Sequence, residues 1–182
     1  PLDPLSLPKP EGGFRACLAG KWTSSRVAFS PDLGLVPVSA EVKEICGRAA
    51  ARLQDLGCSV DEAHPDLSDA DWIFETLRAF VYVERVGPLL AAHRDVLGAH
   101  VVDNAERGLA LDIGDLSRAH IAHGELCRRA VAFFSNFDLL LCPVAISPPF
   151  DAGIRYLEGH LGRTFPTYSG WMALTYAITL TG

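Results

Sequence analysis

The sequence lacks several patterns that would define its chemistry at once. No apolar run approaches the roughly 20 residues of a membrane-spanning helix, and Lys and Arg are not clustered as a nucleic-acid surface requires. The chain has no G-x-S-x-G turn, no G-x-G-x-x-G and no Walker sequence. We therefore expect no membrane or nucleic-acid partner and no nucleotide cofactor.

Cysteine is scarce and widely spaced. The five cysteines include no C-x-x-C pair, so neither a zinc ribbon nor a thioredoxin-type redox site is indicated; they are Cys17, Cys46, Cys58, Cys127 and Cys142. We expect most of them to be reduced, buried, small apolar residues in a cytoplasmic protein.

Hydrophobic residues, in contrast, are abundant. They make up 49% of 182 residues, against 21% charged residues and a net charge of −6, which is enough for one sizeable core or for part of a larger one. The last segment is apolar and aromatic and carries no polar tail. Because chain termini usually lie exposed, we expect this chain to be one segment of a larger domain.

The first 60 residues predict an extended segment followed by a βαβ unit. Residues 1–25 contain three prolines within the first eight positions. A strand is predicted from Arg26 to Ser30, and a helix capped by Ser39 follows it and ends at Gly57. A second strand then starts near Cys58. Strand, helix and strand over residues 26–60 predict an α/β fold.

The remainder predicts a helical region and a buried strand. Across 68–136 we expect one helix opened by Ser68 and ended or interrupted by Pro88, and another capped by Asp115. In 137–182, the apolar run Phe137–Cys142 is typical of a core strand of a parallel sheet. Turn residues across 147–170 predict a long loop, and an apolar element closes the segment.

Three polar groups could in principle carry chemistry. Lys21 with Ser24 and Ser25 could pair a base with a nucleophile, yet the glycine-rich backbone that supplies oxyanion donors is missing, and a polar loop is favoured. His120 and His123 share a helix face but lack a third ligand. We therefore expect no bound metal. A solvated connection is also favoured for the acidic string Asp61, Glu62, Asp66, Asp69 and Asp71.

Taken in order, several segments resemble the later part of amidase-signature hydrolases. They are DPLSLP near the start, RVAFSPDLG, VKEICGRAAARLQDLGCSV with DEAHPDL, FDLLLCPVAISPPF, and ALTYAITLTG. The resemblance implies part of a mixed β-sheet flanked by helices, an incomplete α/β/α fold. It also implies amide hydrolysis by a Ser–Ser–Lys triad through an acyl-enzyme, with no cofactor.

The resemblance assigns no catalytic residue to this chain. The Gly/Ser-rich signature and the catalytic Lys of that family lie upstream of the matched region, so Lys21, Ser24 and Ser25 occupy the wrong place in the order. We expect this segment alone to be inactive and to supply a wall of the substrate pocket. The expected wall residues are Pro143, Val144, Ile146, Phe150, Tyr168, Trp171, Thr175 and Ile178. Periodicity alone favours core roles for Trp171, Leu174, Tyr176 and Ile178.

Two other functions stay open. Within the same family, the parent could be the glutamine-hydrolysing subunit of a tRNA-dependent amidotransferase, although the apolar wall argues against a glutamine site. Alternatively, the chain could be a non-catalytic protein-interaction module with apolar docking surfaces. The expected partners are the remainder of its own chain and a small-molecule amide, and a homodimer is left open.

Overall fold

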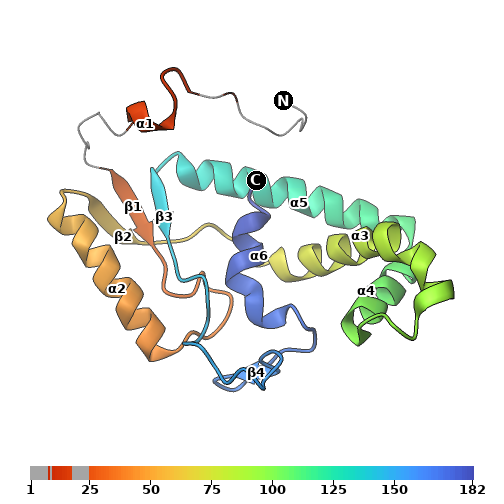
Figure 1. The fold of residues 1–182 in the computed structure, drawn as a ribbon. Coiled ribbons are helices and arrows are strands. Elements are labelled where there is room, and N and C mark those ends of the chain that lie inside the picture. Colours follow the sequence, from red (N-terminus) through yellow and green to blue (C-terminus); the bar gives the residue numbers. More distant parts are fainter. Residues whose placement is uncertain (1–7, 9, 18–24) are drawn as a thin grey trace.

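The computed structural model describes residues 8, 10–17 and 25–182 (Figure 1). Lys21 and Ser24 lie outside the described residues. The described elements comprise helices on both sides of a small parallel sheet, and a hairpin projects at one end. This arrangement confirms the expected α/β class.

The sheet consists of three parallel strands in the order β2-β1-β3. The strands are β1 (Arg26–Phe29), β2 (Ser59–Glu62) and β3 (Leu139–Leu141). Ala28 pairs with Asp61 on one side and with Leu140 on the other. Val27 and Ala28 are fully buried, as expected for a strand that is covered on both faces. The expected βαβ unit is confirmed, and β3 is shorter than the predicted Phe137–Cys142.

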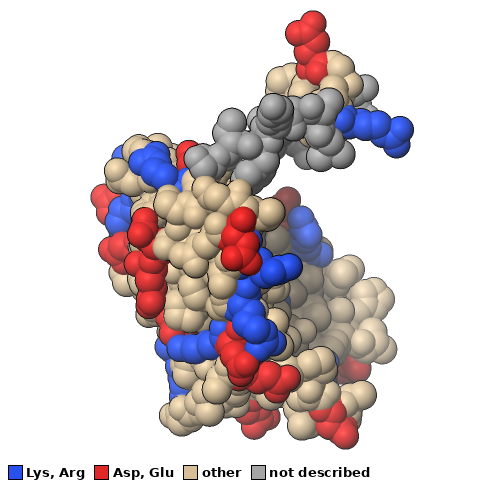
Figure 2. Space-filling view, turned by 90° about the vertical axis from the view of Figure 1, so that its left-hand side faces the viewer, with Lys and Arg blue, Asp and Glu red and all other residues tan. Residues whose placement is uncertain are grey.

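Helix α2 (Ala40–Asp55) connects β1 to β2 and packs against the sheet (Figure 1). Ser39 occupies the N-cap position, as expected, although its side chain makes no capping hydrogen bond. Gly57 adopts a positive φ of 90° just after the helix, a conformation that favours glycine at a helix end. The space-filling view of this side of the molecule shows acidic and basic side chains interspersed, without a large field of one sign (Figure 2).

Most of the remaining helices form a second layer around α3. They are α3 (Ala70–His93), α4 (Ala99–Leu109), α5 (Ile113–Phe134), the 3-10 turn η1 (Gly170–Met172) and α6 (Ala173–Thr179). Helix α1 (Phe14–Cys17), a single turn within the segment predicted to be extended, is not part of this layer. Helix α3 contacts α4, α5 and α6, and Figure 1 shows α6 between the sheet and α3. The central position of α3 makes it the element that joins the core to the polar site described below.

Three details of the helical region differ from the sequence predictions. Asp69, not Ser68, occupies the N-cap of α3, and the helix continues through Pro88 to His93. Proline lacks a backbone donor and so removes one hydrogen bond of the helix, and beyond it Arg94, at the end of α3, pairs with Glu106 of α4. Asp112, not Asp115, caps α5, and the two residues form a reciprocal capping box.

The long segment before α6 is largely loop, as expected, but it contains a short hairpin. Strands β4 (Gly159–His160) and β5 (Arg163–Thr164) pair antiparallel. The chain then turns inward, and Phe165 is buried in the main core cluster. This segment is therefore attached to the core rather than free of it.

The main core cluster joins the sheet side to the helical layer. Its largest fully buried side chains include Leu33, Ile73, Leu126, Ile146 and Leu174. The alternative core interpretation is confirmed for Leu174 and Tyr176, while Trp171 and Ile178 are partly buried against the cluster. Within the described residues, no helix combines the length and apolar character needed to cross a membrane.

Gly108 marks the place where α4 approaches α3 most closely. A Cβ atom at this position would lie 2.2 Å from the carbonyl oxygen of Ala79 and 2.5 Å from Cγ2 of Val83. We expect Gly108→Ala to lower the free energy of unfolding by about 1–3 kcal/mol, because the backbones must separate. Urea unfolding measures this change.

Gly47 provides the matched control. It lies in α2, and a Cβ atom there would meet no atom within 4 Å. Because alanine favours helix, Gly47→Ala should raise the free energy of unfolding by about 0.5–1 kcal/mol. Equal effects of the two substitutions would contradict the close approach of α3 and α4.

Candidate functional site

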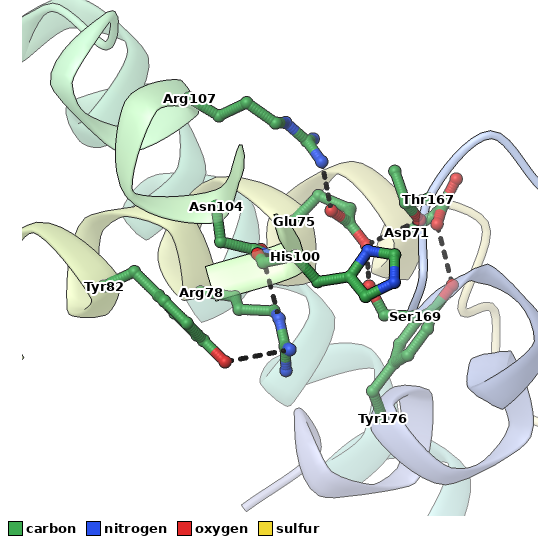
Figure 3. Close-up of polar contacts among 10 residues, drawn as sticks. All are labelled: Asp71, Glu75, Arg78, Tyr82, His100, Asn104, Arg107, Thr167, Ser169 and Tyr176. Atoms are coloured by element: carbon green, nitrogen blue, oxygen red, sulfur yellow. Dashed lines mark hydrogen bonds and ion pairs between the residues drawn. The ribbon is translucent and has the colours of Figure 1, made fainter. Parts of the chain in front are cut away.

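The candidate site is organised by the carboxylate of Glu75 on α3. Glu75 is buried, and its Oε1 accepts hydrogen bonds from Thr167 Oγ1 at 3.1 Å and from Ser169 Oγ (Figure 3). The two hydroxyls lie 92 and 94 residues away in the sequence. One carboxylate oxygen therefore fixes the 165–170 segment against α3.

Arg107 on α4 approaches the other oxygen of the same carboxylate. Its Nη1 lies 3.0 Å from Glu75 Oε2, an ion-pair distance, although Oε2 accepts no hydrogen bond among the described residues. The Glu75 side chain is 11% exposed and that of Arg107 is 39% exposed. A buried carboxylate needs such partners because desolvation penalises its charge. Glu75 thus joins α3, α4 and the 165–170 segment.

One helical turn before Glu75, Asp71 makes the second link. Its Oδ1 accepts a hydrogen bond of 2.7 Å from the Tyr176 hydroxyl on α6. The Tyr176 ring stacks on Phe74 with centroids 4.2 Å apart. Burial, and secondarily the hydrogen bond to Asp71, raise the pKa of Tyr176 well above its usual value. Tyr176 therefore stays a neutral donor that orients the Asp71 carboxylate.

A further polar chain supports the outer part of the site. Arg78 donates from Nε to Asn104 Oδ1 at 3.3 Å, and buried Asn104 donates to the carbonyl of His100 at 2.6 Å (Figure 3). The His100 ring stacks near Tyr168, with centroids 5.0 Å apart. This chain connects α3 and α4 to the segment that carries Thr167 and Ser169.

Two neighbouring cavities open at this cluster. The first has a volume of about 260 Å³ and includes Trp72, Glu75 and Arg107 among its lining residues. The second, of about 300 Å³, includes Ser68, Ala173 and Tyr176. Asp71 and Arg163 line both cavities. A small polar ligand could therefore contact α3, the β4–β5 hairpin and the 165–170 segment together.

The expected wall residues do not gather in one pocket. Pro143 and Ile146 are buried, whereas Val144 and Thr175 are exposed, and Thr175 Oγ1 donates to the Val144 carbonyl at 3.2 Å. The other expected wall residues lie in separate places. Phe150 contacts Trp171, Tyr168 lies near His100, and Ile178 lines an apolar cavity of about 230 Å³. Their role in binding substrate stays a prediction.

Sequence reasoning missed the residues that build the polar cluster. Asp71 was considered as part of the acidic string, and Glu75 was not singled out although it is among the buried residues of α3. Its position one turn after Asp71, beside Phe74 and Ile73, was the available signal. Arg163 gave no signal, since its neighbours in space come from distant segments.

Among the other polar candidates, His123, Asp66 and Asp69 make structural contacts. His123 Nε2 lies 2.9 Å from the Leu180 carbonyl oxygen, and Arg129 forms ion pairs with Asp66 and Asp69. Within the described residues, no three His, Cys, Asp or Glu side chains are grouped to hold a metal. Ser25 directly precedes β1, and its carbonyl accepts a hydrogen bond from the Ser59 amide.

The chain is similar to known amide hydrolases in sequence and in structure. No protein-family model matches it. An acylamidase from Rhodococcus erythropolis is 28% identical over 160 residues, which are 81% of this chain and 31% of that protein. The chain therefore spans about a third of that relative's length.

Solved structures give the same result for the fold. A bacterial aryl acylamidase of the amidase-signature family superposes with a TM-score of 0.76 at 18% identity, over 93% of this chain and 38% of that one. A 6-aminohexanoate cyclic dimer hydrolase superposes with a TM-score of 0.78 at 19% identity, over 100% and 41%. The chain thus has part of the amidase-signature fold, and the resemblance found in the sequence is confirmed.

Glu75→Gln tests the organising role of the carboxylate. The amide keeps the size of the side chain but removes the charge that Arg107 and the two hydroxyls satisfy. We expect the free energy of unfolding to fall by about 1–3 kcal/mol, as measured by urea unfolding. Proteolytic cleavage within 165–170 should also become faster, because a neutral amide oxygen holds the two hydroxyls of that segment less strongly than a carboxylate does.

Glu44→Gln is the matched control. Glu44 pairs with Arg48 on the exposed face of α2, and such a pair contributes at most about 0.5 kcal/mol. If Glu75→Gln changes stability and cleavage no more than Glu44→Gln does, the carboxylate does not organise the site.

Proposed function

We propose that the protein containing this segment is an amidase, which hydrolyses the C–N bond of a small-molecule carboxamide. The sequence similarity to an acylamidase over 81% of the chain carries this proposal. The amidase-signature fold supports it. A fold by itself does not define a reaction, so the relationship in sequence is the decisive support.

In the proposed reaction, a serine outside this chain attacks the amide carbonyl and forms an acyl-enzyme. The amine leaves with a proton, and water then hydrolyses the ester to release the carboxylic acid and regenerate the serine. The catalytic Lys and both serines of the resemblance have no counterpart in the matched segments. The isolated 182-residue chain should therefore be inactive, and its contribution is a wall of the substrate site.

The cavities beside Asp71 are the part of the chain best suited to that role. The first of them combines an exposed aromatic side chain, Trp72, with charged groups at fixed positions, which is the composition of a small-molecule site. The rings of Phe150 and Trp171 have centroids 5.7 Å apart. They form a second surface, which is apolar. An apolar or aromatic acyl group is the ligand that this aromatic pair would accept.

Fluorophosphonate labelling tests where the nucleophile lies. The full-length protein should gain one adduct, detected by intact mass spectrometry, and should hydrolyse an anilide substrate. The isolated chain, of 19.6 kDa, should gain none. An adduct on a peptide from the isolated chain would place the nucleophile here and contradict the proposal, as would a full-length protein that neither reacts with the probe nor hydrolyses amides.

Phe150→Ala tests the aromatic surface. For the full-length protein, kcat/KM for a benzoyl anilide should fall about tenfold relative to an acetyl anilide, since the aryl group loses contact area. Phe14→Ala removes the same side chain at a position that is 77% exposed on α1, and should leave the ratio unchanged. An equal ratio for both variants would remove Phe150 from the substrate wall.

A further inference from the structure

Two opposite charges at the cavities have no ionic partner in the described part of the chain. Asp71 and Arg163 line both the 260 Å³ and the 300 Å³ cavity. The other two charged residues that line the first cavity, Glu75 and Arg107, form an ion pair with each other. Neither Asp71 nor Arg163 forms an ion pair with any described residue, including each other.

Each of the two charges is nevertheless held in place by one hydrogen bond. The Tyr176 hydroxyl donates to Asp71 Oδ1, and among the described residues Oδ2 accepts no hydrogen bond. Arg163 donates from Nη1 to the carbonyl of Leu35, which leaves its other nitrogens available. Both residues are exposed. The site thus presents one oriented anion and one oriented cation on a shared wall.

We propose that this wall binds a small ligand that carries both an ammonium and a carboxylate group, such as an amino acid or an amide that keeps both of these charged groups. The ammonium would contact Asp71 and the carboxylate would contact Arg163, whose planar guanidinium matches a carboxylate. This inference rests on the proposed function, because it names the substrate class of the proposed amidase. It makes Asp71 and Arg163 specificity-determining residues.

The charge balance and the size of the site favour such a ligand over others. A ligand with one charge would satisfy one wall residue and leave the other without a partner. A neutral apolar ligand would desolvate both without compensation. Each cavity is also at or below the lower end of the about 300–1,000 Å³ that drug-sized ligands occupy, which suits a molecule of a few heavy atoms.

Calorimetric titration of the full-length protein tests the proposal without relying on turnover. The probes are β-alanine, 4-aminobutanoate and 6-aminohexanoate, each with an N-acetylated form that lacks the cation and a carboxamide form that lacks the anion. We expect at least one free amino acid to bind about tenfold more tightly than both of its capped forms. Absence of binding, or equal binding of the capped forms, would overturn the proposal.

Two variants assign the charges to residues. Asp71→Asn should remove the preference for the free amine over its N-acetylated form, and Arg163→Gln should remove the preference for the carboxylate over the carboxamide. The controls are Asp103→Asn and Arg85→Gln, which change exposed residues that line neither cavity. If the two site variants change the preferences no more than the controls do, Asp71 and Arg163 are not the recognition groups.

Hydrolysis of a neutral anilide separates this proposal from the proposed function. A protein that hydrolyses the anilide but shows no preference for zwitterionic ligands is an amidase without this recognition site. A protein that binds zwitterions with the expected dependence on Asp71 and Arg163, but hydrolyses no amide, keeps the binding site and contradicts the proposed reaction.

Discussion

The carboxylate of Glu75 is the constraint on which the geometry of the candidate site depends. Its burial removes it from water, so its charge must be satisfied by neighbouring protein groups. Thr167, Ser169 and Arg107 provide those groups from two other parts of the chain. Because three segments converge on a single side chain, the depth of the cavity between α3 and the 165–170 segment is fixed by a polar contact rather than by apolar packing alone.

Helix α3 connects the Glu75 carboxylate to the core. Its buried residues Ile73 and Ala79 face the core and α4, while Asp71 and Trp72 reach the cavities. Gly108 allows α4 to lie directly against the backbone of α3, and this contact brings Arg107 to Glu75. Tyr176 links the same helix to α6 through one hydrogen bond and one stacked ring. The site is therefore built on helices that the core already positions.

The sequence alone was sufficient to predict the strands and helices that have strong local signals. The run of apolar residues before Pro143 indicated β3, and the spacing from Arg26 to Val60 indicated the parallel βαβ unit, because burial on both faces leaves a continuous apolar stretch. Local signals were less reliable at helix ends. Ser68, Asp69 and Asp71 are all of a type that caps helices, and the structure has Asp69 at the N-cap of α3.

The polar site could not be predicted from the sequence, for a physical reason. Glu75 and Ser169 are 94 residues apart, and neither belongs to a motif with a fixed spacing. Arg163 gains its position from a two-residue hairpin strand that has no periodicity to detect. The family resemblance suggested candidate wall residues such as Phe150 and Trp171, but it carries no information about which polar groups meet across the fold.

We propose that the cavities at Asp71 and Glu75 form a wall of the substrate site of an amide hydrolase. The most direct measurement is a crystal structure of the full-length protein whose nucleophilic serine carries a phosphonate that mimics the acyl group. We expect the substituent on phosphorus to extend toward the wall formed by Trp72, Asp71 and Arg163. A substituent that lies on another face of the fold, with these cavities filled by solvent or by the rest of the chain, would contradict it.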